Sequence, residues 1–226
     1  MRQLIGFDTE TTGVDVTLDR IVTAAVVRRA ADGTTQTQTW LINPGVAIPE
    51  RATAIHGITT ERAQTEGMPP DQALEEVARA LTEFLITQAP VLAFNAAFDL
   101  RLVEAELARH GLPPLSQRLG RDVAPVVDPL VLDRALVHFR KGKRRLDDLM
   151  AAYGVPSSDN LHDALEDVHQ AIAVFDAIEA KYERISQMDA MALHKWQTLG
   201  HRKWAESFNR WLVGRGEVGD VDLAWP

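Results

Sequence analysis

The sequence has no cysteine, few aromatic residues and no long hydrophobic run. Without cysteine among its 226 residues, the chain cannot form disulfides, thiolate metal sites or a cysteine nucleophile. No apolar run approaches the roughly 20 residues that span a bilayer. The first residues become strand-like within a few positions, which leaves no room for a signal peptide. We therefore expect a cytoplasmic protein with no membrane partner.

Positive charge is also scarce. The chain has 24 Lys and Arg residues against 32 Asp and Glu, a formal net charge of −8. A protein that binds duplex DNA regardless of sequence gains its affinity from many Lys and Arg contacts to phosphates. The charge balance argues against such a protein, but it is compatible with an enzyme that holds a few phosphates through metal ions.

A strand near the N-terminus carries the strongest chemical signal. Leu4, Ile5 and Phe7 predict a buried strand, which nevertheless ends in Asp8 and Glu10. Alternation along a strand places these two carboxylates on one face. Neighbouring carboxylates that are removed from water repel each other, and a bound cation relieves the repulsion. Oxygen ligands alone favour Mg²⁺ or Mn²⁺ over Zn²⁺.

The remaining pattern predicts an α/β fold with a mixed central sheet. Strands are expected at 5–10, 20–29, 34–43, 91–95 and 123–128, the first three as an antiparallel meander. Helices are expected at 70–88, 96–110, 129–139, 146–153 and 163–184. A meander followed by alternating helices and strands predicts a sheet flanked by helices.

Four further polar residues stand where chemistry is possible. Asp99 follows a strand at the start of a helix, and Asp167 lies about one turn into a later helix. His162 precedes that helix, and His56 stands beside Gly57 in an irregular segment. Each has an ordinary alternative. Asp99 and Asp167 could be first-turn acids favoured by the helix dipole. His162 could be a surface histidine, and His56 a turn residue that hydrogen-bonds locally.

At the start of the later helix, two of the polar residues are explained as helix caps and two are not. Asp163 and Glu166 have the spacing of a capping box, which would use both of them. His162 and Asp167 would lie about 140° apart on a continuous helix. If Asp163 is the N-cap, His162 is outside the helix and can face the same site as Asp167.

Three segments together resemble the motifs of the DEDDh exonuclease family, which includes the proofreading subunit of bacterial replicative polymerases and RNase T. Residues 7–13 (Phe-Asp-Thr-Glu-Thr-Thr-Gly) resemble the first motif, 95–99 (Asn-Ala-Ala-Phe-Asp) the second and 162–167 (His-Asp-Ala-Leu-Glu-Asp) the third. Segments 55–59 and 146–149 also resemble the family, so the resemblance covers about residues 1–185. One departure is Phe94, where some relatives carry a histidine.

The resemblance implies an RNase H-like fold and two-metal cleavage from a 3′ end. Asp8, Glu10, Asp99 and Asp167 would hold two Mg²⁺ or Mn²⁺ ions, and His162 would be the general base. Two ions can serve the attacking and leaving oxygens, and a histidine can accept a proton at neutral pH. The candidate substrate-binding residues are Thr11, Thr12, His56, Asn95 and Phe98, although Phe98 alone is typical of a core.

We therefore predict a metal-dependent 3′→5′ exonuclease that acts on single-stranded DNA or frayed 3′ ends and releases nucleoside 5′-monophosphates. One alternative is an RNA 3′-exonuclease of the RNase T or oligoribonuclease type. Others are a phosphodiesterase for small nucleotides and a non-catalytic nucleic-acid-binding or polymerase-docking module. The presence of all five catalytic positions counts against the module.

Residues 1–185 are predicted to form the exonuclease domain and 186–226 a Trp-rich helical tail. The tail's apolar stripe comprises Ile185, Met188, Ala192, Trp196 and Leu199, continued by Trp204, Phe208 and Trp211. Packing of this stripe onto the core is favoured. Docking of a polymerase or another protein, and stacking on single-stranded nucleic acid, are the alternatives. The absence of a convincing sliding-clamp-binding peptide weakens an assignment as a replicative proofreading subunit.

The basic connector at residues 140–145 permits two interpretations. It has five Lys and Arg residues in six positions. A run of like charge is ordinarily a solvated loop. In a nuclease, the same run could form an edge that contacts phosphates and offsets the acidic body.

Overall fold

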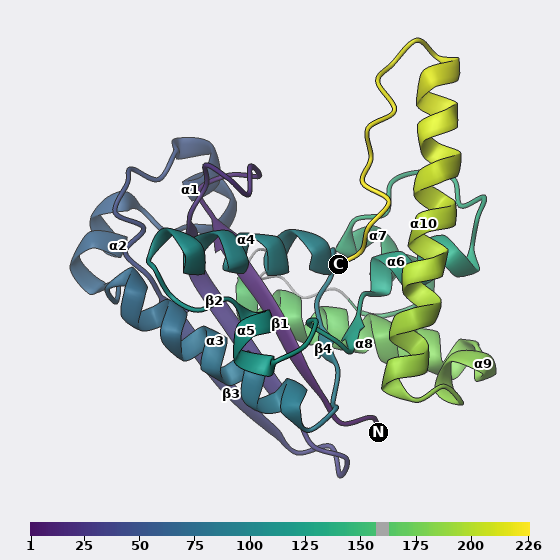
Figure 1. Cartoon of the computed structure of the whole chain (residues 1–226), viewed down its shortest axis with the longest axis horizontal. Coiled ribbons are helices and arrows are strands. Elements are labelled where there is room, and N and C mark those ends of the chain that lie inside the picture. The colour runs from purple at the N-terminus through teal and green to yellow at the C-terminus, as the bar shows by residue number, and fades with distance from the viewer. Residues whose placement is uncertain (157–162) are drawn as a thin grey trace.

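A computed structural model describes residues 1–156 and 163–226. Its centre is a five-stranded sheet in the order β3-β2-β1-β4-β5 (Figure 1). The strands are β1 (Leu4–Thr11), β2 (Ile21–Arg29), β3 (Thr35–Leu41), β4 (Val91–Leu92) and β5 (Val126–Val127). β1, β2 and β3 pair antiparallel, whereas β4 and β5 run parallel to β1. The predicted meander with two added strands is confirmed.

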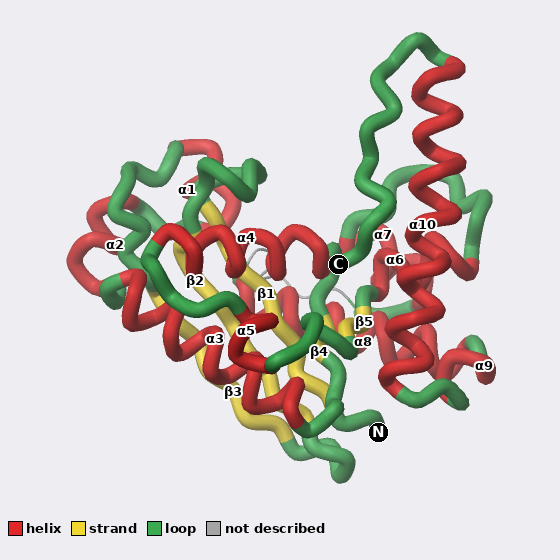
Figure 2. The backbone as a smooth tube through the Cα atoms, viewed as in Figure 1, coloured by secondary structure: helices red, strands yellow, loops and turns green. Residues whose placement is uncertain are grey.

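Helices cover both faces of this sheet (Figure 2). The first six are α1 (Glu50–His56), α2 (Thr60–Glu66), α3 (Pro70–Ile86), α4 (Ala96–Arg109), α5 (Leu115–Leu119) and α6 (Pro129–Leu136). The others are α7 (Leu146–Tyr153), α8 (Ala164–Lys181), α9 (Glu183–Ser186) and α10 (Ala190–Gly214). α3 and α4 pack on one face of the sheet, and α8 packs on the other. The helix predicted for 163–184 is interrupted at Tyr182, where α9 begins a new turn.

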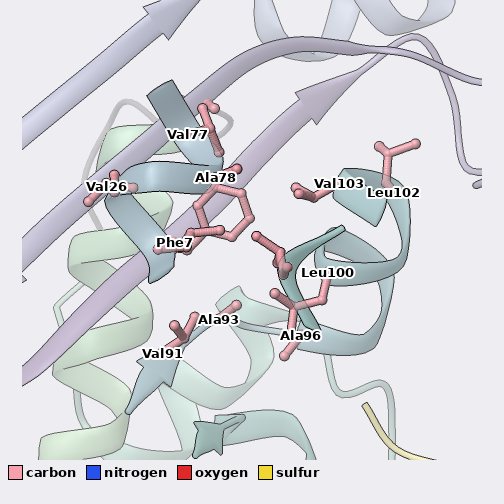
Figure 3. Close-up of a cluster of buried hydrophobic side chains, with 14 of the residues drawn as sticks. Phe7, Val26, Val77, Ala78, Val91, Ala93, Ala96, Leu100, Leu102 and Val103 are labelled. Carbon is pink, nitrogen blue, oxygen red and sulfur yellow. The ribbon is translucent and has the colours of Figure 1, made fainter. Parts of the chain in front are cut away.

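The two faces of β1 have different neighbours. Ile5 and Phe7 lie in the core cluster with α3 and α4, and Figure 3 shows Phe7 among Val77, Ala78 and Leu100. Leu4 belongs to the cluster that α8 covers. Because side chains alternate along a strand, Asp8 and Glu10 lie on the α8 face as well.

Gly6 allows α8 to approach this strand closely. A Cβ at this position would lie 2.4 Å from Val168 Cγ1 and 2.9 Å from Ile172 Cδ1. A glycine inside a strand often marks such an approach. Because Asp167 precedes Val168, the close packing also brings Asp167 to the strand that carries Asp8.

The C-terminal helix packs on the core through its first half only. α10 contacts α6 and β5, then extends beyond the rest of the molecule, and residues 215–226 run back beside it (Figure 1). The predicted packing is thus confirmed for this half, and the domain division at residue 185 stays a prediction. No helix among the described residues is long and apolar enough to cross a membrane.

The stripe by which α10 packs differs from the predicted one. Ala192, Leu199 and Trp211 are exposed, Leu199 by 61%, so their inclusion was wrong. The buried residues of α10 are Leu193, Gln197, His201 and Ala205. Gln197 can be buried because its side chain accepts a hydrogen bond from the Asp128 N–H and donates one to the Val126 carbonyl. A search for apolar residues alone misses such a position.

Candidate active site

Three carboxylates from two elements form a compact cluster. Oxygen atoms of Asp8, Glu10 and Asp167 all lie within 4.8 Å of one another. Asp8 and Glu10 come from one face of β1, as predicted, and Asp167 comes from the first turn of α8. The cluster is thus assembled where the α8 N-terminus crosses the end of β1.

Asp99 reaches the same region from the opposite layer. It lies in the first turn of α4, is only 3% exposed, and accepts a hydrogen bond of 2.7 Å from Thr9 Oγ1. Its negative charge raises the pKa of both Asp8 and Glu10. The structure therefore brings together the four carboxylates named from the sequence, with Thr9 as an anchor that the sequence had not singled out.

The electrostatics of this cluster favour any positive charge that can enter it. Burial raises the pKa of Asp8 well above its usual range, and the charges of Asp99, Asp167 and Glu10 raise it further. Burial, followed by Asp167 and Asp99, raises the pKa of Glu10 to about 8. Burial raises the pKa of Asp99 to about 7, despite the hydrogen bond from Thr9. Raised carboxyl pKa values mean that the ionised groups lack compensation within the protein.

The position of Asp99 depends on a left-handed residue and a buried acid. Asn95 has φ 62° and ψ 43°, a conformation that Asn tolerates better than most residues. The Asp128 carboxylate accepts hydrogen bonds from the backbone N–H groups of Asn95 and Ala96, at 3.1 and 3.0 Å. It also caps α6 through the Leu130 N–H.

Sequence reasoning missed this role of Asp128. The available signal was an Asp directly before Pro129, which is the pattern of an N-cap followed by proline at the first helical position. Burial raises the pKa of Asp128 to about 6, and the backbone N–H groups that it accepts from act in the opposite direction. The pattern predicts the cap of α6, but only the tertiary structure shows that the same carboxylate holds the turn before α4.

A pocket of about 470 Å³ opens beside Glu10. Residues 9–14 form one wall, α1 contributes Ile55 and His56, and α4 contributes Phe98. This volume is within the range of small-molecule binding pockets. The structure thus places candidate substrate residues on one cavity: Thr11, Thr12, His56 and Phe98.

The threonine turn is held by its own hydrogen bonds. The Thr12 N–H donates to the Arg20 carbonyl, and the Thr12 hydroxyl donates to Asp19. The Thr11 hydroxyl donates to the Gly13 carbonyl. The Asp19 carboxylate lies 2.5 Å from where a Cβ of Gly13 would be, so a larger residue there would displace the Asp19 side chain. The Thr12 amide is therefore already used, and the predicted substrate contact of Thr12 stays a prediction.

His56 takes part in a local turn as well as in the pocket wall. Its Nδ1 accepts a hydrogen bond from the Ile58 N–H at 3.1 Å, which is the local role considered for it above. Burial lowers the pKa of His56, so the neutral ring is favoured. The ring is thereby fixed in the lining of the cavity that Phe98 also lines.

A second pocket, of about 420 Å³, shares Thr9 and Phe98 with the first. Asp8, Asp99 and Asn95 line it together with cationic side chains. These cations are Arg134 from α6 and Arg144 and Arg145 from the basic connector. Negative and positive groups therefore occur together in the lining of this pocket.

Neither interpretation of the basic connector describes all of it. Arg140 and Arg144 both bind the fully buried carboxylate of Asp133, so these two are neither solvated nor free to form a phosphate-binding edge. Tyr153 donates a further hydrogen bond to Asp133, at 2.7 Å. Arg145 is exposed and pairs with acids at the start of α7. The sequence did not show that a buried acid on α6 forms ion pairs with two arginines of the connector.

The third motif is only partly within the described residues. His162 lies outside them, so its role as general base stays a prediction. Asp163 is the N-cap of α8, as predicted, and accepts from the Leu165 N–H. The predicted capping box was wrong in its second half, because Glu166 instead accepts a hydrogen bond from the Gln170 side chain.

The donor set fits divalent metal ions with a preference for oxygen. It consists of carboxylates from three elements, and within the described residues no Lys or Arg forms an ion pair with Asp8, Glu10 or Asp99. Mg²⁺ and Mn²⁺ prefer such ligands. Asp8, Glu10, Asp99 and Asp167 would hold these ions.

The five-stranded mixed sheet and the carboxylate cluster have the RNase H-like arrangement that the motif resemblance implies. The family model described as "Exonuclease" matches residues 5–175. The chain belongs to this exonuclease family. The resemblance seen in the three motifs is thereby confirmed.

Curated relatives include polymerase-associated proteins. A DNA polymerase III subunit epsilon-like protein of Rhodobacter capsulatus is 35% identical over 169 residues, which cover 71% of this chain and 21% of that protein. A PolC-type DNA polymerase III of Streptococcus pneumoniae is 29% identical over 171 residues, or 76% of this chain and 10% of the polymerase. The chain thus spans about a tenth to a fifth of the length of these relatives.

Solved structures of exonuclease I share the fold. Exonuclease I of E. coli in complex with a dT13 oligonucleotide has a TM-score of 0.67 at 22% identity, over 82% of this chain and 43% of that one. Exonuclease I of Methylocaldum szegediense has a TM-score of 0.65 at 24% identity, over 93% and 46%. The RNase H-like α/β fold is therefore shared over most of the chain.

Proposed function

We propose that the protein is a metal-dependent 3′→5′ exonuclease that shortens single-stranded DNA and releases nucleoside 5′-monophosphates. The observation that carries this proposal is the cluster of Asp8, Glu10 and Asp167, in which the pKa values of Asp8 and Glu10 are raised and Glu10 lines a pocket. Such a site has the ligands that phosphodiester hydrolysis by divalent metals requires.

The residues of the chain would divide the work. Asp8, Glu10, Asp99 and Asp167 would hold two Mg²⁺ or Mn²⁺ ions, which supply charge stabilisation and an activated water. His162 would accept the proton of the attacking water, which is the task of a general base. Phe98 and His56 would bound the terminal nucleoside in the pocket beside Glu10.

Single-stranded DNA is favoured as substrate over RNA. Structural neighbours of the chain were solved with dT13 and dA16 oligonucleotides, and the curated relatives are DNA polymerase III proteins. The net charge of −8 disfavours a duplex, whose binding depends on many phosphate contacts.

The direct test compares 5′-labelled single-stranded DNA and RNA of one sequence, with Mg²⁺, Mn²⁺ or EDTA. We expect a metal-dependent ladder that shortens from the 3′ end, with DNA degraded faster. Faster degradation of RNA would show that the proposed substrate is RNA and not DNA. No cleavage of either by the folded protein with metal would contradict the proposed activity.

The proposed base is tested by His162→Ala. Loss of a general base should lower kcat by about 10²–10⁴-fold while Mg²⁺ binding persists. His169→Ala is the matched control, because His169 is an exposed histidine of α8. Loss of metal affinity in His162→Ala would show instead that His162 is a ligand.

A further inference from the structure

Three aromatic side chains of α10 form a stacked ladder. The ring centroids of Trp204 and Phe208 are 5.3 Å apart with an interplanar angle of 13°, and those of Phe208 and Trp211 are 5.3 Å apart at 19°. Spacings of four and three residues place them in one row along the helix. Trp211 is 51% exposed, so the far end of the ladder is open to solvent.

An arginine lies at each end of this ladder. The Arg134 guanidinium lies over the Trp204 ring at 3.7 Å from its centroid, and Arg215 lies over Trp211 at 4.7 Å. Arg134 forms no hydrogen bond or ion pair with any residue of 1–156 or 163–226. Its planar group is held by Trp204, and its donors are left for another acceptor.

Arg134 connects the ladder to the active site. It lines the pocket that Asp8 and Asp99 also line, and its ring partner Trp204 lines a second groove. α6 and α10 pack against each other along this boundary (Figure 1). A chain molecule bound along α10 would therefore arrive at the catalytic carboxylates past Arg134.

The groove beside the ladder has a composition suited to nucleic acid. It has a volume of about 520 Å³ and no acidic residue in its lining. Arg184 and Lys203 supply positive charge, and Phe139 is 96% exposed beside Trp196. α10 carries four Lys and Arg residues and one Glu, within a chain of net charge −8. Aromatic rings with interspersed cations are the usual surface for single strands.

We propose that the groove and ladder of α10 bind the single strand that leads to the active site, and that Arg134 contacts a backbone phosphate at the junction. This inference rests on the proposed exonuclease function and extends it to the substrate upstream of the cleaved end. Continuity with the catalytic pocket favours a nucleic acid over an acidic peptide, which has no reason to end at metal-binding carboxylates.

The ladder is tested with Phe208→Ala and Trp211→Ala. The binding of a labelled single strand of about 16 nucleotides, at the upper end of common site sizes, is measured by anisotropy in EDTA. We expect affinity to fall about 5- to 150-fold in each variant, as for the loss of one base–aromatic stack. Val213→Ala is the control, since Val213 is 63% exposed on the same helix. Wild-type affinity in both variants would overturn the ladder's role.

Turnover distinguishes this inference from the proposed function. Each protein is given a dinucleotide and the long strand with Mg²⁺, and thermal unfolding checks that it is folded. We expect the ladder variants to lose about tenfold or more of the preference for the long strand, through KM and not kcat. Equal losses on both substrates would overturn the inference. If the wild type cleaves neither substrate, the proposed function itself fails.

The phosphate contact is tested by salt dependence. Each phosphate contact to a single strand contributes about 0.7 to the slope of log affinity against log salt. Arg134→Gln should lower the slope by about that amount, and Arg134→Lys should retain the slope but bind less tightly because it loses the stack. Arg79→Gln, at an exposed ion pair of α3, should change neither. An unchanged slope in Arg134→Gln would overturn the contact.

The competing occupant is tested with an acidic, apolar-ended peptide. If Phe208→Ala and Trp211→Ala abolish binding of this peptide and leave binding of the long strand intact, the surface is a protein dock. That result would overturn the inference. Binding of the strand alone, lost in both variants, would support it.

Discussion

The molecule contains two groups of carboxylates whose charges are treated in opposite ways. Asp133 is fully buried, and its oxygens accept hydrogen bonds from Arg140, Arg144 and Tyr153. Asp8 and Glu10 face other carboxylates, and their pKa values are raised. The first arrangement is complete within the protein, whereas the second requires protons or cations from solution.

This contrast separates structure from function. A buried charge is costly unless it is paired, so a structural carboxylate is provided with its own cations. A cluster that repels itself persists only because the surrounding fold holds it. We interpret uncompensated repulsion in a pocket as the mark of a site that binds something. The following predictions test this contrast, from the largest effect to the smallest.

Asp8→Asn should abolish catalysis and at the same time stabilise the metal-free protein. The rate should fall by at least roughly 10³-fold, because metal-supplied charge stabilisation is worth several kcal/mol. Unfolding in EDTA at about pH 8 should shift to higher temperature, because one repelling charge is removed. Initial rates and thermal melts measure both effects, with Asp71→Asn as an exposed control. Wild-type activity would refute the metal site.

Asp133→Asn should have the opposite pattern. Removing one partner of a buried pair leaves the other charges uncompensated, so the free energy of unfolding should fall by about 3–5 kcal/mol. Denaturant unfolding measures the loss. The rate per folded molecule should change far less than in Asp8→Asn. A stability equal to that of the wild type would contradict this prediction, because it would mean that both guanidinium groups can be hydrated without cost.

Gly6→Ala should disturb the catalytic cluster through packing. The added methyl group would overlap Val168 and Ile172, and overpacking of this kind costs about 1–3 kcal/mol. Displacement of α8 would move Asp167 from Asp8, so we also expect weaker Mg²⁺ binding, measured by calorimetry. Gly214→Ala is the matched control, because no atom lies within 4 Å of its added Cβ. Unchanged Mg²⁺ affinity would mean that the packing of α8 at Gly6 does not position Asp167 for metal binding.

The pH dependence of stability should depend on metal. The folded pKa of Glu10 is about 8, raised from 4.5, so the folded state holds the proton more tightly than the unfolded state. This contribution to the free energy of unfolding is therefore present below about pH 4.5 and is lost as pH rises to about 8. Mg²⁺ should raise the melting temperature more at about pH 8.5 than at pH 6, because protons compete for the carboxylates. An equal gain at both pH values, or the same pH difference in Glu10→Gln, would contradict this assignment.

Much of the site could be read from local patterns. Alternation placed Asp8 and Glu10 on one face, and the cap at Asp163 fixed Asp167 in the first turn of its helix. These are short-range rules, because the strand period and the helix start depend on residues a few positions apart. The order of the segments was enough to predict a meander and a mixed sheet.

The errors concern polar residues buried through distant partners. The Asp128 N–H donates a hydrogen bond to the side chain of Gln197, which lies 69 residues further along the chain. Nothing near either residue in the sequence indicates this bond. For Arg140 and Arg144, a solvated connector and a phosphate-binding edge were both considered, and neither holds because their acceptor is Asp133 on α6. A polar group can be buried only where the fold supplies its hydrogen-bond partners. When those partners are far along the chain, the neighbouring sequence does not indicate them.

The sequence by itself determined the strand and helix starts, the ligand types and the family resemblance, because these depend on residue identity and short spacing. The tertiary structure alone decided that Gly6 admits α8, that Asp128 holds the turn before Asp99, and that Trp204 lies on Arg134. Each of these joins segments far apart in the chain, and only packing of the whole core fixes which segments meet.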